Sequence, residues 1–194
     1  DIGLDYSRSK LHGEREACKV AQRGLPLVIL RPVVILGPGD IYQSSTSTIL
    51  AFVRGKMPVY VEGRPSFGDV REMAAAHVAA LTKGRSGDTY ILGGNNVTLT
   101  ELLAAIQDVT GVAPPPQVPY PLAYSIAGVI EYIAKLRHQH ASLSRQLAKA
   151  GHMCTWVSSD KAKAELGYSI RPLRDSLRDT IRFALHSGRL RPTT

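Results

Sequence analysis

The chain has 194 residues, of which 44% are hydrophobic and 21% charged, and its formal net charge is +8. This length allows one domain with a sizeable core, and no apolar run approaches the roughly 20 residues of a membrane-spanning helix. The two cysteines, Cys18 and Cys154, form neither a disulfide framework nor a metal-ligand spacing. We therefore expect a reducing, cytoplasmic compartment.

The positive charge is spread along the chain and is densest between Lys135 and His152. Basic stretches can bind nucleic acid or a membrane surface. Few aromatic residues interleave with this one, so we interpret it as a solvated helix face and expect no nucleic-acid partner and no membrane span. Its histidines, which include His138 and His140, lack acidic or cysteine partners at a metal-ligand spacing, so no metal site is predicted.

The first predicted elements are a helix over residues 6–22 and a strand over residues 25–36. The helical segment contains no proline, and Gly24 follows its end. The strand segment is a continuous, branched apolar run, which is typical of a parallel strand buried on both faces. Gly37-Pro-Gly-Asp40 then breaks the run as a loop. A helix followed by a buried strand and a loop is typical of an α/β fold.

The middle of the chain continues the alternation of helix and strand. A short helix is predicted over residues 47–54 and a short strand over residues 58–61. Asp69 is expected to cap a helix over residues 69–82, in which helical spacing is kept by Val70, Met73, Ala74, His77, Val78 and Leu81. A strand is predicted at residues 89–92. Thr98 and Glu101 then form a capping-box pattern that begins a helix ending at Gly111.

The last part of the chain is predicted to be mostly helical. The prolines between residues 114 and 121 form a stiff spacer. Helices are expected over residues 122–136, 142–149, 159–166 and 174–186. Ser159 is expected to cap the third of these helices, and Gly167 is expected to end it.

Tyr6 and Lys10 have the spacing Tyr-x-x-x-Lys within the first predicted helix. Side chains four residues apart share a helix face, and a nearby cation stabilises a phenolate. Tyr6 is therefore a candidate proton donor or acceptor for a carbonyl/alcohol pair, and Lys10 a candidate partner for the ribose of a nicotinamide cofactor. The alternative is an exposed helical pair without chemistry.

Pro32 and Val33 lie within the apolar run, where the strand approaches its end. Ligands of doubly wound sheets bind at the carboxyl ends of strands, so these residues are predicted to lie beside a cofactor ring. The alternative for Pro32 is a simple strand terminator.

Several motifs, taken in order, resemble the extended short-chain dehydrogenase/reductase superfamily of NAD-dependent epimerases and dehydratases. They span nearly the whole chain and are Tyr6-Ser-Arg-Ser-Lys10 with Glu14, Leu30-Arg-Pro-Val-Val-Ile-Leu-Gly-Pro-Gly-Asp40, Gly68–His77, Gly87–Asn95 with Thr98–Leu103, and Ser158–Tyr168. Gly55-Lys-Met-Pro58 and Tyr90-Ile-Leu-Gly-Gly94 bring the resemblance nearest to the dihydroflavonol-4-reductase-like branch, which includes hopanoid-associated sugar epimerases.

The resemblance implies the C-terminal part of a Rossmann-like, doubly wound parallel sheet with a smaller, mostly helical substrate domain. Residues 1–40 would end the dinucleotide-binding domain and carry the Tyr–Lys helix. Residues 41–194 would form the substrate-binding region, interleaved with the remaining Rossmann elements. The family's glycine-rich phosphate turn and its catalytic Ser or Thr have no counterpart in the sequence. We therefore expect a portion of a longer enzyme that alone binds cofactor poorly and catalyses little.

The resemblance also implies roles for individual residues. Tyr6 would be the catalytic acid/base and Lys10 its electrostatic and ribose-holding partner, so both would contact the cofactor, NAD or NADP. Pro32 and Val33 would line the nicotinamide. Family members commonly pair through the helix that bears the Tyr–Lys motif, so the intact protein is expected to be a homodimer.

Three functions are compatible with these features. The first is a nicotinamide-dependent carbonyl reductase or dehydrogenase, the second is an NAD-dependent sugar epimerase or dehydratase, and the third is a non-catalytic cofactor-binding or regulatory protein. Nucleotide-sugar epimerases hold the diphosphate with an arginine where this chain has Pro65 or Ser66, with Arg64 adjacent. This departure favours a small carbonyl/alcohol substrate over a nucleotide sugar.

Overall fold

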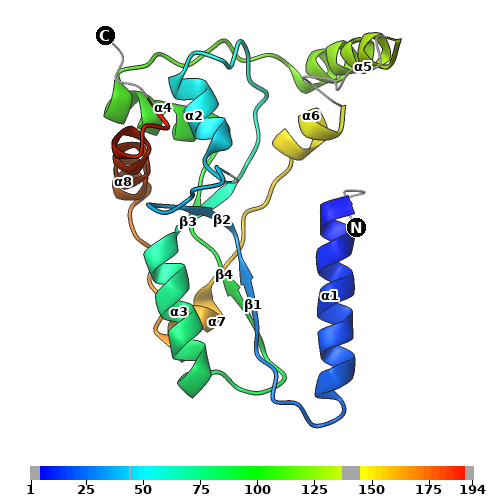
Figure 1. The fold of residues 1–194 in the computed structure, drawn as a ribbon, viewed down its shortest axis with the longest axis vertical. Coiled ribbons are helices and arrows are strands. Elements are labelled where there is room, and N and C mark those ends of the chain that lie inside the picture. Colours follow the sequence, from blue (N-terminus) through cyan, green and yellow to red (C-terminus); the bar gives the residue numbers. More distant parts are fainter. Residues whose placement is uncertain (1–4, 44, 137–144, 191–194) are drawn as a thin grey trace.

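The computed structural model describes residues 5–43, 45–136 and 145–190. Helices and strands alternate through the first half of the chain, and helices predominate after residue 98 (Figure 1). The elements are α1 (Asp5–Ala21), β1 (Ile29–Pro32), β2 (Val34–Leu36), α2 (Ser47–Val53), β3 (Ser66–Asp69), α3 (Val70–Lys83), β4 (Thr89–Leu92), β5 (Asn95–Asn96), α4 (Leu99–Thr110), α5 (Tyr120–Leu136), α6 (Arg145–Gly151), α7 (Asp160–Leu166) and α8 (Leu173–His186).

The strands form two small sheets. β1 pairs in parallel with β4, which places Ile29 opposite Thr89 and Pro32 opposite Leu92. β2 pairs in parallel with β3, and β3 pairs antiparallel with β5. The chain passes through α3 between β1 and β4, so these parallel strands are joined by a helical crossover. The predicted α/β class is confirmed.

Two clusters of buried apolar side chains stabilise these short strands. One lies between α2, α4 and α8 and includes Leu50, Leu103 and Leu177. The other lies between α3, β4 and α7 and includes Met73 and Leu166. Burying one large apolar side chain contributes roughly 1.5–3 kcal/mol. The two clusters therefore supply the burial that strands of two to four residues need in order to be stable.

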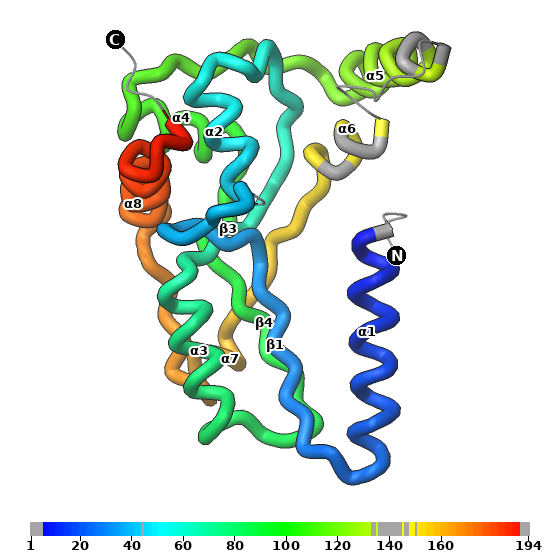
Figure 2. Tube along the Cα trace, in the orientation of Figure 1, coloured from blue at the N-terminus to red at the C-terminus, as the bar shows by residue number. Residues whose placement is uncertain are grey.

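The apolar run at residues 25–36 differs from its prediction, because it forms two short strands and is not buried on both faces. Arg31, Pro32 and Val34 are exposed. Within the described ranges, β1 has β4 as its one strand neighbour, and α1 stands apart from the sheet (Figures 1 and 2). One edge of β1 therefore carries no neighbouring strand, which leaves these side chains accessible.

The buried side of α3 is formed mostly by small residues. Of the six residues that keep the predicted helical spacing, four are exposed, namely Ala74, His77, Val78 and Leu81. The side chains that face the core are Met73, Ala76 and Ala80. Two alanines allow the helix to approach the strands closely, so the bulkier Val78 and Leu81 lie outside and are 67% and 85% exposed.

The predicted helix caps are confirmed in two cases. Asp69 accepts a hydrogen bond from a backbone N–H in the first turn of α3, and Thr98 forms a capping box with Glu101. Ser159 occupies the N-cap position of α7, but its hydroxyl accepts a hydrogen bond from the N–H of Gly93 (2.8 Å) rather than capping the helix. The serine therefore links α7 to the chain that follows β4.

Two predicted elements differ in extent. The strand expected at residues 58–61 is a single bridge between Tyr60 and Gln117. Pro58 and the prolines on both sides of Gln117 lack the N–H groups that a longer ladder would need. The helix expected at residues 142–149 is observed as α6, while residues 142–144 lie outside the described residues.

Candidate functional site

Tyr6 and Lys10 lie one turn apart near the N-terminal end of α1. Lys10 Nζ is 5.5 Å from the centroid of the Tyr6 ring, and the tyrosine is 72% exposed. The helix holds them together because residues four apart occupy one face. The ammonium is thus placed where it would stabilise negative charge on the phenol.

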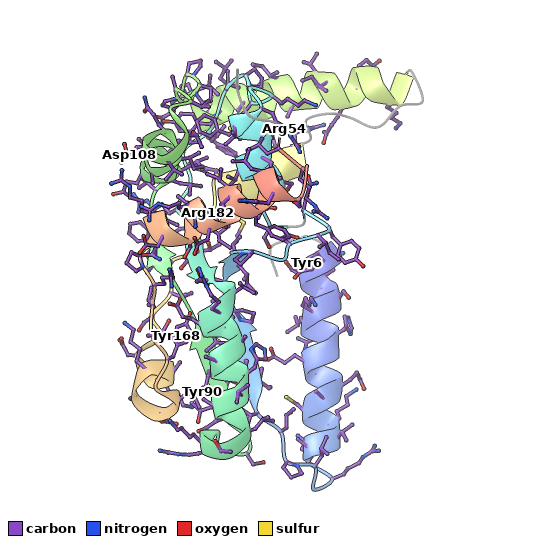
Figure 3. The ribbon with its side chains drawn as sticks, turned by 60° about the vertical axis from the view of Figure 1, so that its left-hand side comes forward. Tyr6, Arg54, Tyr90, Asp108, Tyr168 and Arg182 are labelled. Carbon is purple, nitrogen blue, oxygen red and sulfur yellow. The ribbon has the colours of Figure 1, made fainter. Side chains whose placement is uncertain are left out.

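In Figure 1 the helix end that carries Tyr6 lies at about the same height as the carboxyl end of β1. The chain descends through α1, turns, and ascends through β1, and Figure 3 shows Tyr6 at the top of its helix. Pro32 ends β1 and is exposed, while Val33 is half-buried and donates its N–H to the carbonyl of Leu92 (3.1 Å). The four predicted site residues therefore share one end of the sheet.

An ion pair joins α1 to β1. Arg31 donates two hydrogen bonds to the Glu14 carboxylate, from Nε to Oε2 (3.0 Å) and from Nη2 to Oε1. Glu14 follows Lys10 by one turn, and Arg31 directly precedes Pro32. The hydrogen bond from Arg31 lowers the pKa of Glu14, so the carboxylate remains ionised and paired.

Sequence reasoning assigned no role to this ion pair. Glu14 belongs to the Tyr–Lys motif and Arg31 to the apolar run, and neither pattern by itself indicates an ion pair. The available signal was a carboxylate four residues after Lys10, on the same helix face, together with an arginine at a strand end. Their contact depends on how the helix and the strand cross, which local spacing does not specify.

Two other tyrosines are buried beside α3 and serve the fold (Figure 3). Burial raises the pKa of Tyr90, whose hydroxyl donates to Glu165 Oε2 (2.8 Å). Burial also raises the pKa of Tyr168 to about 12, and its hydroxyl donates to the carbonyl of Gly93 (2.5 Å). Lys161 Nζ lies 4.7 Å from the Tyr90 ring centroid, so a lysine near a tyrosine does not by itself mark a site. Exposure distinguishes Tyr6 from both.

The buried carboxylate of Asp69 links β3 to two helices, α3 and α8. Asp69 accepts hydrogen bonds from Arg71 Nε (2.8 Å), Arg71 Nη2 (2.7 Å) and Ser176 Oγ (2.7 Å). Burial alone would raise the pKa of Asp69, but the hydrogen bonds from Arg71 and Ser176 outweigh it and hold the pKa at about 2. Arg71 also pairs with Asp179 (2.8 Å). The network therefore joins β3, α3 and α8.

Of the two positions that could correspond to a diphosphate-binding arginine, Ser66 is buried and Pro65 is half-buried. The Ser66 hydroxyl accepts a hydrogen bond from the N–H of Gly94 (3.2 Å), and the serine has no exposed surface. The guanidinium of Arg64 lies 5.5 Å from the centroid of the Trp156 ring. Ser66 therefore cannot contact a ligand, and Arg64 makes a cation–π contact instead.

The described residues contain no group of three or more His, Cys, Asp or Glu side chains placed to hold a metal ion. His138 and His140 lie outside the described part of the chain. Cys18 and Cys154 are both reduced thiols rather than a disulfide.

Known proteins are similar to this chain in sequence and in fold. Residues 4–93 match the NAD dependent epimerase/dehydratase family. A protein of Synechocystis sp. (strain PCC 6803) named after dihydroflavonol 4-reductase is 33% identical over 189 residues, which cover 94% of this chain and 55% of that protein. The chain thus spans about half the length of this relative.

Two solved structures show the same arrangement. The crystal structure of gox2253 has a TM-score of 0.79 at 35% identity, and that of a nucleoside-diphosphate-sugar epimerase from Pseudomonas aeruginosa has a TM-score of 0.79 at 27% identity. Each match covers 96% of this chain and 57% of the other chain. These likenesses confirm the predicted Rossmann-like α/β fold.

Proposed function

This chain belongs to the NAD dependent epimerase/dehydratase family of extended short-chain dehydrogenases/reductases, and from that premise we propose that it is part of a longer nicotinamide-dependent carbonyl reductase or dehydrogenase. That longer protein is called the full-length protein below. The observation that carries the proposal is the exposed Tyr6–Lys10 pair at the end of the sheet where β1 ends. Residues 1–40 would complete the dinucleotide-binding domain, and residues 41–194 would form the substrate region.

The residues present fit the nicotinamide side of a cofactor, NAD or NADP. When bound, the nicotinamide supplies or accepts the hydride of the reaction. Tyr6 would donate its proton to the carbonyl oxygen that becomes an alcohol, or accept it in the reverse direction. Lys10 would stabilise the resulting phenolate and hold the ribose hydroxyls. Pro32 and Val33 would offer an apolar surface to the ring, because Pro32 has no N–H and that of Val33 is already bonded.

The second candidate function is an NAD-dependent sugar epimerase or dehydratase. The similarity to the Pseudomonas aeruginosa epimerase favours it, and the same Tyr–Lys pair could serve transient oxidation of a sugar. The burial of Ser66 and the contact of Arg64 with Trp156 argue against a nucleotide-sugar diphosphate at this position. The reductase is therefore the main proposal, acting in the cytoplasm on a small carbonyl/alcohol as a homodimer.

Cofactor titration tests the proposal directly. We expect the full-length protein to bind NADH or NADPH at least about 100-fold more tightly than the 194-residue chain, because the main phosphate-binding turn would lie upstream. Nicotinamide fluorescence measures both affinities and identifies the preferred cofactor. Equal binding by both proteins would contradict the assignment of the phosphate site. Binding by neither would favour the third candidate, a non-catalytic protein.

The Glu14–Arg31 ion pair is expected to position the catalytic helix. In the full-length protein, Glu14→Gln should lower kcat about 10-fold and change the substrate KM by less than about 2-fold, because small displacements of a catalytic group slow chemistry more than binding. Exchanging the two residues, Glu14→Arg with Arg31→Glu, should recover most of the loss. Steady-state kinetics of the three proteins provide the measurement.

The matched control for this prediction lies on the same helix. Glu16 pairs with Lys19 (2.7 Å), both side chains are exposed, and such surface pairs contribute little. Glu16→Gln should therefore leave kcat unchanged. An equal loss in the control, or no recovery in the exchanged protein, would show that the Glu14–Arg31 pair has no specific positioning role.

A further inference from the structure

Helix α5 carries a stripe of exposed apolar side chains along one face. The stripe consists of Leu122, Ile126, Val129 and Tyr132, which are 51%, 45%, 60% and 66% exposed. The four residues follow each other at intervals of four, three and three, which keeps them on one side of a helix. Ala123 and Ala127 are buried on the other side, where α5 packs against α6.

The helix that carries this stripe projects from the rest of the molecule (Figure 1), and polar contacts hold it in place. Glu131 on α5 accepts hydrogen bonds from the N–H of Arg145 (2.8 Å) and from its Nε (2.9 Å), which joins α5 to α6. After α6, His152 Nδ1 lies 2.8 Å from the carbonyl oxygen of Glu62. The α5–α6 pair is thus anchored to the segment that leads into β3.

The sequence around the stripe is strongly basic. Residues 120–159 contain a single acidic residue, Glu131, whereas their Lys and Arg residues are Lys135, Arg137, Arg145 and Lys149. The hydrogen bond from Arg145 lowers the pKa of Glu131, so this one carboxylate is ionised and already paired with Arg145. Lys135 and Lys149 are exposed. An apolar helix face beside net positive charge is complementary to a lipid bilayer, whose acyl chains can bury the apolar side chains and whose anionic headgroups attract the basic ones.

We propose that α5 docks this protein onto an anionic lipid bilayer, with the stripe at the boundary between headgroups and acyl chains. Among the described residues, no helix is long and apolar enough to cross a bilayer, so α5 would lie in the plane of the interface. Charge distinguishes this partner from a second copy of the chain, because pairing two α5 stripes would bring like charges together. The inference does not depend on the proposed enzyme activity.

Vesicle flotation of the full-length protein tests the proposal. We expect vesicles with about one-third phosphatidylglycerol to bind at least about 10-fold more protein than pure phosphatidylcholine vesicles at about 0.1 M salt. The preference should largely disappear at about 1 M salt, where charges are screened within a few ångströms. No binding to either vesicle, or equal binding to both, would overturn the proposal.

A pair of matched double variants locates the binding surface. Ile126→Ser with Val129→Ser should lower vesicle binding about 10-fold. Val78→Ser with Leu81→Ser removes similarly exposed apolar side chains from α3 and should leave binding unchanged. Unchanged thermal unfolding would show that both variants fold. Equal loss in the two variants would overturn the assignment to α5, as would an α5 variant that alters sedimentation but not vesicle binding, since the stripe would then join two copies.

Discussion

Replacing Tyr6 with phenylalanine in the full-length protein is expected to lower kcat by about 10²–10⁴-fold, the range that a positioned general acid/base contributes. The ring and its contact with Lys10 would remain, so the variant removes the transferable proton and little else. The cofactor Kd should change by less than about 3-fold, because most binding contacts of a dinucleotide are made to its phosphates and ribose. NAD(P)H absorbance with a panel of small ketones and aldehydes measures kcat, and nicotinamide fluorescence measures the Kd.

A second tyrosine supplies the control for this experiment. The Tyr60 hydroxyl lies 2.9 Å from Thr100 Oγ1, on the segment that leads into β3 rather than on α1. Tyr60→Phe removes a phenolic hydroxyl of the same kind and should leave kcat within about 2-fold of the unaltered protein. A Tyr6→Phe protein with unchanged kcat would remove Tyr6 from catalysis and make a binding or regulatory function the better proposal.

The elements that the sequence predicted best are those whose signals act within one helical turn. Asp69 and the Thr98–Glu101 pair hydrogen-bond to backbone groups two or three residues away, so their positions alone indicate where helices begin. Gly111 and Gly167 adopt φ values of 75° and 72°, which glycine reaches without steric cost, and each ends a helix as predicted. The Tyr6–Lys10 approach follows from the same local geometry.

The features that the sequence did not predict depend on neighbours distant in the chain. The apolar run at residues 25–36 indicates a strand, but its burial depends on which elements lie against it. The spacing on α3 permits either of two faces to point inward, and the packing of Ala76 and Ala80 decides which one does. The Glu14–Arg31 contact spans 17 residues and depends on the crossing of a helix and a strand.

Substituting alanine for Asp69 is expected to destabilise the protein by about 3 kcal/mol. The change removes the cap of α3, leaves the buried Ser176 hydroxyl without its acceptor, and deprives Arg71 of a buried partner. Breaking a buried ion pair costs roughly 3–5 kcal/mol, and the effect falls at the lower end here because Arg71 is 43% exposed and keeps Asp179. Urea unfolding of the full-length protein at neutral pH measures the loss.

Acid provides an independent test of the same carboxylate. The pKa of Asp69 is about 2 in the folded chain, against 3.8 for an aspartate in the unfolded chain. Ionisation of Asp69 therefore contributes about 2 kcal/mol to the free energy of unfolding above pH 4. This contribution is lost as the pH falls from about 4 to 2, and the loss should be missing in Asp69→Asn. Asp108 is the control, because its pair with Arg174 (3.6 Å) is exposed on both sides and Asp108→Ala should cost less than about 1 kcal/mol. Similar losses in the Asp69 and Asp108 alanine variants would contradict a buried network that holds β3, α3 and α8 together.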